Sequence, residues 1–295
     1  MTSPDLPVLV VPAAGYGTRM AALTGGGAKE LLVLGHPPGL SVPCLLVPFL
    51  EALAAGIREA AVILRPGKEE LRDVLSDERA VAARFPEAAE AFARVREGIA
   101  LHFFTQAARR GEADAIHCAA PLLRGRALAV HYPDNVPVPG RFSAPQAESV
   151  FAPLLALAGD SGVPDCMALM EVTPQNMAGL SDSGRVDLEE HALKKGEVFR
   201  ILDFLPKGPG PFTPRFAGEL RTCGIYLAGR AYLEYCAACL RLAPEGEVTD
   251  GMVRRLMLDD GIVFCGARVP GTVHDVGNPK GYAACRTALA AARGA

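Results

Sequence analysis

The sequence carries no strong excess of charge of either sign. Its 295 residues contain 30 Lys and Arg against 33 Asp and Glu, a formal net charge of −3. Such a balance excludes a general attraction to nucleic acid or to an anionic membrane surface, because both require an excess of cations. Any phosphate site must therefore be local, and must be built from a few Lys, Arg and backbone N–H groups.

Long apolar runs are missing as well. Half of the residues are hydrophobic, yet no run reaches the roughly 18 residues that suggest a transmembrane helix. No basic segment precedes the first apolar stretch, as a secretory signal requires. We therefore expect no membrane partner and a cytoplasmic location.

Paired cysteines are scarce. The eight cysteines form one CxxC, at Cys236 and Cys239, with no second CxxC and no pair of histidines nearby. A metal or redox site there is only weakly supported. Several other cysteines lie inside apolar segments, where cysteine usually acts as a small buried hydrophobe. This usage fits a reduced protein.

Two familiar phosphate-binding patterns are absent from the first glycine-rich loop, which reads PAAGYGTRMAALTGGGAKE over residues 12–30. The Walker pattern GxxxxGK[ST] fails because Ala28 precedes Lys29 and Glu30 follows it. The dinucleotide pattern GxGxxG fails because Met20 stands in the place of the third glycine.

Short β-rich runs alternate with longer helical patterns, which is typical of an α/β fold built from βαβ units. We expect a doubly wound, mostly parallel mixed sheet with helices on both faces. The strands are expected at 6–12, 60–64, 99–104, 127–132, 166–172, 198–204, 220–227 and 262–269. The helices are expected at 44–55, 113–123, 232–242, 249–258 and 279–293, with two more over 69–97 broken at Pro86. Two Pro/Gly-rich stretches, 133–145 and 206–214, are expected to be loops.

The placement of the first loop points to phosphate. It directly follows the first buried strand, and the carboxyl ends of strands are where open α/β sheets bind ligands. Gly15 and Gly17 let backbone N–H groups approach phosphate closely. Arg19 can hydrogen-bond two phosphate oxygens at once, and Lys29 adds a second positive charge. The alternative interpretation is a tight turn with a surface Arg and a surface Lys and no bound ligand. The additional residues of AAGxGTRM and KELL favour the phosphate site over this alternative.

The stretch resembles the signature of the sugar nucleotidyltransferase family, PAAGxGTRMxPLTxxxPKELLPV, with Ala22 and Ala28 in place of two prolines. Within the family it is most similar to bacterial uridylyltransferases and thymidylyltransferases that act on glucose 1-phosphate. The resemblance implies a Rossmann-like fold over one continuous domain, 1–295. Residues 1–135 are expected to bind mainly the nucleotide and 136–295 mainly the sugar phosphate.

Later motifs extend the resemblance to residue 282. Gln106 with GEADA (111–115) is similar to Q…GTADA, and ILDFLPKG (201–208) is similar to DFxEKP. VHDVGNPKGY (273–282) is similar to YDCGDKLGY, and the strand ALAVHYPDN (127–135) ends in the acid expected to bind metal. Alternatives from local structure stay open, since Asp134 could simply form an Asp-Asn turn. Asp250, in EVTDGM, could cap a helix or orient the sugar site, and the cap is favoured.

The resemblance assigns a role to each of these residues. Ala13, Ala14, Gly15, Gly17, Thr18, Gln106 and Gly111 are expected to bind the nucleotide, Arg19 and Lys29 to be catalytic, and Glu171, Lys207 and Gly224 to bind the sugar phosphate. If Lys207 does not, Lys194 or Lys195 becomes the next candidate. Asp134 and Asp275 are expected to hold Mg²⁺, which prefers oxygen ligands and takes few protein carboxylates.

The expected reaction joins a nucleoside triphosphate, with UTP or dTTP favoured, to a sugar 1-phosphate, with glucose 1-phosphate favoured, and releases pyrophosphate. Two alternatives remain at this point. Unusual residues at Ala28, Glu112 and Pro206 motivate a non-catalytic nucleotide-sugar-binding regulatory homologue. The acceptor could also be a non-sugar phosphate such as phosphocholine. Members of the family that this sequence resembles are commonly oligomeric, so a homo-oligomer is also possible for this protein.

Overall fold

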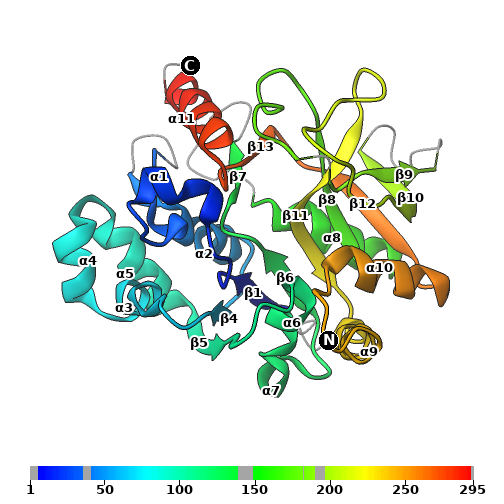
Figure 1. Cartoon of the computed structure of the whole chain (residues 1–295), viewed down its shortest axis with the longest axis horizontal. Helices are drawn as coiled ribbons and strands as arrows, with labels where there is room; N and C mark the ends of the chain where they lie inside the picture. Colours follow the sequence, from blue (N-terminus) through cyan, green and yellow to red (C-terminus); the bar gives the residue numbers. More distant parts are fainter. Residues whose placement is uncertain (1–5, 36–40, 139–148, 182, 190–196, 294–295) are drawn as a thin grey trace.

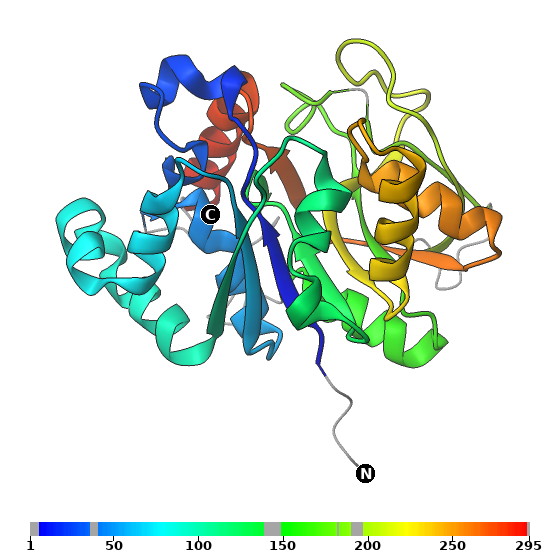
Figure 2. The same cartoon turned by 60° about the horizontal axis from the view of Figure 1, so that its bottom comes forward.

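The computed structural model describes residues 6–35, 41–138, 149–181, 183–189 and 197–293. A nine-stranded sheet crosses the molecule, with helices packed on both of its faces (Figures 1 and 2). In spatial order its strands are β5 (Ala100–Thr105), β4 (Glu59–Leu64), β1 (Val8–Pro12), β6 (Leu128–His131), β11 (Leu220–Ala228), β8 (Cys166–Glu171), β12 (Phe264–Arg268), β10 (Val198–Phe204) and β9 (Val186–Leu188).

The sheet is parallel in its first part and mixed in its second. Strands β5, β4, β1 and β6 all run in one direction, and β8 is parallel to β12. Strand β11 is antiparallel to both of its neighbours, and so is β10. The expected α/β fold with a mixed sheet is confirmed. The expectation of mostly parallel pairing is corrected, since parallel and antiparallel pairings are equally frequent.

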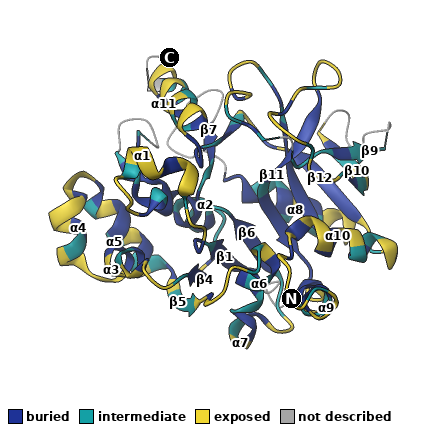
Figure 3. Ribbon diagram, in the orientation of Figure 1, coloured by how far each residue is buried: buried dark blue, intermediate teal, exposed yellow. Residues whose placement is uncertain are grey.

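The core explains why the first strand is a continuous apolar run. Leu9 and Val11 point into the hydrophobic cluster beneath one layer of helices, and Val8 and Val10 point into the cluster on the opposite face. A strand buried on both faces needs apolar residues at every position. Figure 3 shows the result, with buried strands between helices whose outer sides are exposed.

The α-helices, with the bounds that the structure gives them, are α1 (Ala21–Thr24), α2 (Val47–Ala54), α3 (Glu69–Ser76), α4 (Glu78–Arg84), α5 (Ala89–Gly98), α6 (Glu112–His117), α7 (Ala120–Leu123), α8 (Phe151–Ser161), α9 (Tyr232–Leu242), α10 (Asp250–Asp259) and α11 (Pro279–Arg293). Short 3-10 turns lie at η1 (Thr18–Met20), η2 (Lys29–Leu31), η3 (Cys44–Leu46) and η4 (Pro86–Ala88). Among the described residues, no helix combines the length and the apolar character needed to cross a bilayer.

Some helix expectations are corrected. The segment 69–97 forms three helices rather than two, because Asp77 starts a new helix by accepting a hydrogen bond from the backbone of Arg79 at 2.9 Å. The segment 113–123 is divided into α6 and α7, with Pro121 in the first turn of α7. Helix α8 was not expected.

The loop expected at 133–145 contains a strand that is central to the site. Strand β7 (Asn135–Val138) pairs antiparallel with β13 (Thr272–Asp275), and Asn135 lies opposite Asp275. The pairing places Asp134 beside Asp275, although the two are far apart in sequence. Helix α11 packs over this ribbon in a small cluster that includes Val136 and Leu289. Residues 139–145 of the expected loop lie outside the described residues. The loop expected at 206–214 contains no helix or strand of the named elements.

A second short ribbon follows the glycine-rich loop. Strand β2 (Val33–Leu34) pairs antiparallel with β3 (Val42–Pro43). Leu34 joins the cluster beneath α11, so this ribbon connects the end of the first loop to the C-terminal helix.

Candidate functional site

A cavity of about 500 Å³ opens at the carboxyl ends of the four parallel strands. Its wall contains Pro12 at the end of β1 and the first residue after each of β4, β5 and β6, namely Arg65, Gln106 and Tyr132. The remaining lining residues are Ala14, Gly15, Tyr16, Gly17, Thr18, Arg19, Lys29, Glu30, Ala108, Arg109, Gly111, Glu112, Ala115, Pro133, Asp134, Ser181, Lys207, Glu247 and Gly277.

The glycine-rich loop forms one wall of this cavity. Gly17 adopts a left-handed conformation with φ of +66°, which glycine accepts without strain. The turn η1 then begins, and Met20, which is fully buried, anchors it to the core. Arg19 is exposed and forms no hydrogen bond or ion pair among the described residues, so its guanidinium is available to a ligand.

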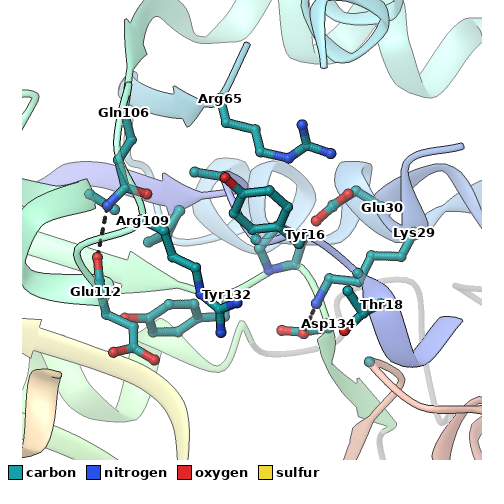
Figure 4. Close-up of a pocket in the computed structure, with 18 of the residues that line it drawn as sticks. Tyr16, Thr18, Lys29, Glu30, Arg65, Gln106, Arg109, Glu112, Tyr132 and Asp134 are labelled. Atoms are coloured by element: carbon teal, nitrogen blue, oxygen red, sulfur yellow. Dashed lines mark hydrogen bonds and ion pairs between the residues drawn. The ribbon is translucent and has the colours of Figure 1, made fainter. Parts of the chain in front are cut away.

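Lys29 is paired with Asp134 across the cavity (Figure 4). Burial is the largest single influence on the pKa of Lys29 and works to lower it, but the charges of Asp134, Glu30 and Asp275 and the hydrogen bond to Asp134 together raise this pKa. Burial likewise works to raise the pKa of Asp134, but the charge and hydrogen bond of Lys29, together with the charge of Arg19, lower this pKa. Both groups are therefore charged at neutral pH.

Asp275 completes an acidic pair beside Gly277. A Cβ built on Gly277 would lie 2.7 Å from Asp134 Oδ2, 2.9 Å from Asp275 Oδ1 and 3.3 Å from Arg19 Nη2, so the three groups converge on one small space. Burial, and then the charge of Asp134, raise the pKa of Asp275. A cation between the carboxylates would relieve this repulsion.

The donor set at this space fits Mg²⁺. Asp134 lines the open cavity, and Asp275 stands beside it next to Gly277 without lining the cavity itself. The cavity leaves room for water and for phosphate oxygens around a metal at this space, which is how Mg²⁺ is usually held. Within the described ranges, no group of three or more His, Cys, Asp or Glu side chains could hold a metal ion on its own. The site therefore suits a metal that is shared with a phosphorylated ligand.

Gln106 lies at the other end of the cavity. Its Nε2 donates to the Gly111 carbonyl and to Asp114 Oδ2, both at 2.9 Å. This network assigns the amide orientation, and Figure 4 shows the side-chain oxygen of Gln106 on the other side of the amide from the dashed hydrogen bond of its nitrogen. Gly111 has a φ of +86°, and a Cβ there would lie 2.4 Å from the Val248 carbonyl. The segment that contains Val248 therefore fits closely against this loop.

A cationic cluster surrounds Tyr16 at the cavity wall (Figure 4). The guanidinium carbons of Arg65 and Arg109 lie 4.7 and 5.7 Å from the centre of the Tyr16 ring. Arg109 is also paired with Glu247 at 2.6 Å. Together with Arg19, Lys29 and Lys207, these arginines give the cavity five cationic side chains, which favours an anionic ligand.

The structure brings together most, but not all, of the expected site residues. Lys207 is exposed and lines the cavity, so Pro206 does not turn it away. Ala13 is buried beneath the loop. Glu171, at the end of β8, is paired with Arg268 outside the lining. Gly224 also lies outside it, and the space where its side chain would stand is filled by the Asn135 amide at 2.2 Å from a built Cβ. Lys194 and Lys195 lie outside the described residues.

Sequence reasoning missed two sets of buried polar contacts at and behind the cavity wall. Lys68 forms an ion pair with Glu30 at 2.8 Å. The Asp250 carboxylate accepts hydrogen bonds from three tyrosines and from Arg254. The reading of Asp250 as a cap is corrected, because the cap of α10 is Thr249. Both groups depend on long-range packing, which no local motif predicts.

Comparisons with known proteins agree on one fold. No family model matches the chain. A UTP–glucose-1-phosphate uridylyltransferase from Haemophilus influenzae is 26% identical over 286 residues, which cover 92% of this chain and 89% of that protein. A structure of UDP-glucose pyrophosphorylase complexed with UDP-glucose has a TM-score of 0.74 at 20% identity and covers 97% of this chain and 98% of its own. A UTP-bound enzyme of the same kind from Acinetobacter baumannii has a TM-score of 0.72 at 18% identity, with 97% and 93% covered.

The fold is therefore that of the UDP-glucose pyrophosphorylase structures, with a glycine-rich loop and an acidic pair at the carboxyl edge of the sheet. Within that class, the sequence likeness that extends over most of this chain is to a UTP–glucose-1-phosphate uridylyltransferase, at 26% identity.

Proposed function

We propose that the protein transfers a nucleotidyl group from a nucleoside triphosphate to a sugar 1-phosphate and releases pyrophosphate. The observation that carries this proposal is the convergence of Asp134, Asp275 and Arg19 on the space beside Gly277, with Lys29 paired to Asp134. The arrangement combines cations for phosphate with carboxylates for a divalent metal. The relatives named above act on UTP and glucose 1-phosphate, which makes these the favoured substrates here, with dTTP as the alternative nucleotide.

Charge placement accounts for the chemistry of transfer. A sugar-phosphate oxygen attacks the α-phosphorus, the bond from this phosphorus to the bridging oxygen breaks, and pyrophosphate takes the electron pair. Such a step requires positioning and charge stabilisation rather than a covalent intermediate with the protein. Arg19 stabilises the leaving pyrophosphate, and Lys29 moves from Asp134 to the reacting phosphates. Asp134 and Asp275 would hold Mg²⁺, which would neutralise phosphate charge.

The base is read by the carbonyl of Gln106. Because its amide nitrogen is already committed to Gly111 and Asp114, Gln106 presents an acceptor to the ligand. Uracil and thymine offer a ring N–H donor at N3, whereas the corresponding ring nitrogens of cytosine and adenine are acceptors and their donors are exocyclic amines. If the Gln106 oxygen meets the ring nitrogen, it favours UTP or dTTP over CTP or ATP. Guanine also has such a donor, so GTP is the informative competitor.

The acceptor end of the cavity is assigned to the second half of the chain. Lys207 has no hydrogen bond or ion pair among the described residues and lies at the lining, so it is free to hold the sugar phosphate. We also propose how the two substrates are divided between the two halves of the chain. Residues 1–135 bind mainly the nucleotide and 136–295 mainly the sugar phosphate, within one domain.

One departure from the family pattern has a structural explanation that supports activity. Ala28 stands where the signature has proline, and its backbone N–H donates to Glu70 Oε1 at 3.0 Å. A proline has no N–H to donate. The replacement therefore adds an anchor next to Lys29, which argues against a non-catalytic homologue.

A panel of pyrophosphate-release assays tests the proposal. UTP, dTTP, GTP, CTP and ATP are each combined with glucose 1-phosphate, other sugar 1-phosphates and phosphocholine, with Mg²⁺ or with excess chelator. We expect metal-dependent release with a uracil or thymine nucleotide and a sugar phosphate. Asp134→Asn and Asp275→Asn should each lower turnover by roughly 10²-fold. Pyrophosphate release with phosphocholine but with no sugar 1-phosphate would show that the acceptor belongs to another class. Absence of pyrophosphate release with every pair of substrates would overturn the proposal.

A further inference from the structure

A buried ion pair joins Glu30, which lines the cavity, to Lys68 behind it, and Lys68 also contacts the end of the strand that leads into the glycine-rich loop. Lys68 Nζ donates to Glu30 Oε1, to Glu30 Oε2 and to the carbonyl oxygen of Ala13, each at 2.8 Å. Both side chains are only 3% exposed. The three contacts connect the end of β1, the KELL segment and the residue that precedes α3.

Stability alone does not explain this pair. Removing two charges from water is expensive, and apolar residues of similar volume often stabilise a protein as well or better. In some proteins such a pair instead fixes one arrangement of the groups that it joins. Here those groups are the Ala13 backbone, two residues before Gly15, and Glu30, the immediate neighbour of Lys29.

Lys29 is held on both sides by the start of α3. On one side, Ala28 N donates to Glu70 Oε1 at 3.0 Å. On the other side, Glu30 is bound by Lys68. The backbone on either side of Lys29 is thus fixed, and its side chain extends into the cavity toward Asp134 (Figure 4). The same Lys68 restrains the strand end from which the glycine-rich loop departs.

We propose that Lys68 and Glu30 are positioning residues that set the distance between Lys29 and the glycine-rich loop, so that both meet the nucleotide phosphates at once. This inference rests on the proposed function for the identity of the ligand. Because the pair touches the nucleotide side of the cavity only, its loss should impair nucleotide binding and turnover. The affinity for the sugar phosphate should be preserved.

Three variants separate positioning from a merely structural role. Glu30→Gln keeps the shape and one acceptor for Lys68 but removes the charge. Lys68→Met leaves Glu30 buried without its partner, and is expected to be unstable. The double variant Lys68→Met/Glu30→Leu replaces the pair by apolar residues, and should melt near the wild-type temperature. As a control, Arg126→Met/Glu59→Leu removes an ion pair near the start of β4, at the opposite end of that strand from the cavity.

The measurements are thermal melting, steady-state kinetics for each substrate, and calorimetry of nucleotide binding without acceptor. We expect kcat/KM for the nucleotide to fall roughly 10- to 100-fold in the double variant, as small misplacements of reacting groups do. The KM for the sugar phosphate should stay within about twofold of wild type, and the control pair should change neither.

The outcomes are distinguishable. A double variant that melts like wild type and keeps the wild-type nucleotide affinity and kcat/KM would overturn the proposal. If the double variant does not fold, the melting temperature, nucleotide affinity and kcat/KM of Glu30→Gln are compared with those of wild type instead. Equal losses of kcat/KM for the nucleotide and for the sugar phosphate would also count against a positioning role. Wild-type protein that binds nucleotide but transfers nothing would refute the proposed function instead, and calorimetry of the variants would still test the positioning role.

Discussion

Replacing Gly277 with alanine tests the geometry of the site with a single methyl group. The backbone of Gly277 lies outside the left-handed region, so the alanine acts by its volume alone. Its Cβ would lie 2.7 Å from Asp134 Oδ2 and 2.9 Å from Asp275 Oδ1, both closer than a carbon and an oxygen normally approach. The carboxylates must therefore move apart by several tenths of an ångström.

The consequence should be large for turnover and small for stability. Displacing reacting groups by fractions of an ångström to an ångström can cost roughly 10²-fold in rate, so we expect Gly277→Ala to lower kcat by about that factor. The Mg²⁺ concentration for half-maximal activity should rise, because both metal-binding oxygens are displaced. The free energy of unfolding should fall by only about 1 kcal/mol, the lower end of the range for overpacking, since the Asp134 side chain is partly exposed and can move.

The assay is pyrophosphate release titrated with Mg²⁺, with thermal melting in parallel. Gly159→Ala is the matched control, because a Cβ at Gly159 meets nothing within 4 Å and this exposed residue lies within α8. The control should keep wild-type activity and gain up to roughly 1 kcal/mol of stability. Wild-type turnover and Mg²⁺ dependence in Gly277→Ala would refute the view that the metal and the phosphates meet beside Gly277.

Three further predictions follow from the same cavity. Arg19→Ala should mainly weaken the nucleotide-dependent steps and Lys207→Ala should mainly raise the KM for the sugar phosphate, each by roughly ten- to a hundredfold for a lost charge-assisted contact; unchanged acceptor binding by calorimetry in Lys207→Ala would remove that residue from the acceptor site. Gln106→Ala should raise the KM for the preferred nucleotide and reduce discrimination against CTP and ATP, and an unchanged ranking of nucleotides would place base recognition elsewhere. Glu112 is an exposed residue at the cavity lining, where desolvation of its carboxyl and the charge of Asp250 raise its pKa to about 7, so the carboxyl ionises as pH rises through neutrality and should then repel the anionic nucleotide. The KM for the nucleotide should therefore rise from pH 6 to 8 in wild type and stay flat in Glu112→Gln. Because the folded state keeps this proton above the ordinary pKa of a glutamate, the contribution of Glu112 to stability should also decline between about pH 4.5 and 7, and a melting temperature that responds identically to pH in both proteins would contradict the shift.

Local patterns predicted the elements better than the contacts between them. The strand at 198–204 and the helices at 232–242 and 279–293 have the predicted bounds, because their apolar periodicity and flanking residues are local signals. Strand β7 was mistaken for loop, because Pro137 and the surrounding prolines suppress the local strand signal. Its pairing with β13 is a long-range event that only the folded chain reveals.

In the site, too, local features were predictable from the sequence and long-range contacts were not. The glycine-rich loop could be placed from sequence, because it directly follows a buried strand. The distance between Asp134 and Asp275 could not, because it depends on the β7–β13 ribbon. The ion pair of Lys68 and Glu30 was missed for a similar reason, since it joins segments on different loops. These sequence-derived roles of individual residues stay predictions until the variants are assayed.

The most direct measurement of the central claim follows the phosphorus atoms. The protein is incubated with Mg²⁺, a sugar 1-phosphate and UTP labelled either at the α-phosphate or at the γ-phosphate, and the products are separated. Attack at the α-phosphorus predicts that the α-label appears in a nucleoside diphosphate sugar, while the γ-label appears in pyrophosphate. Transfer of the γ-label to the sugar phosphate, or release of the α-label as a nucleoside monophosphate without a sugar adduct, would contradict it.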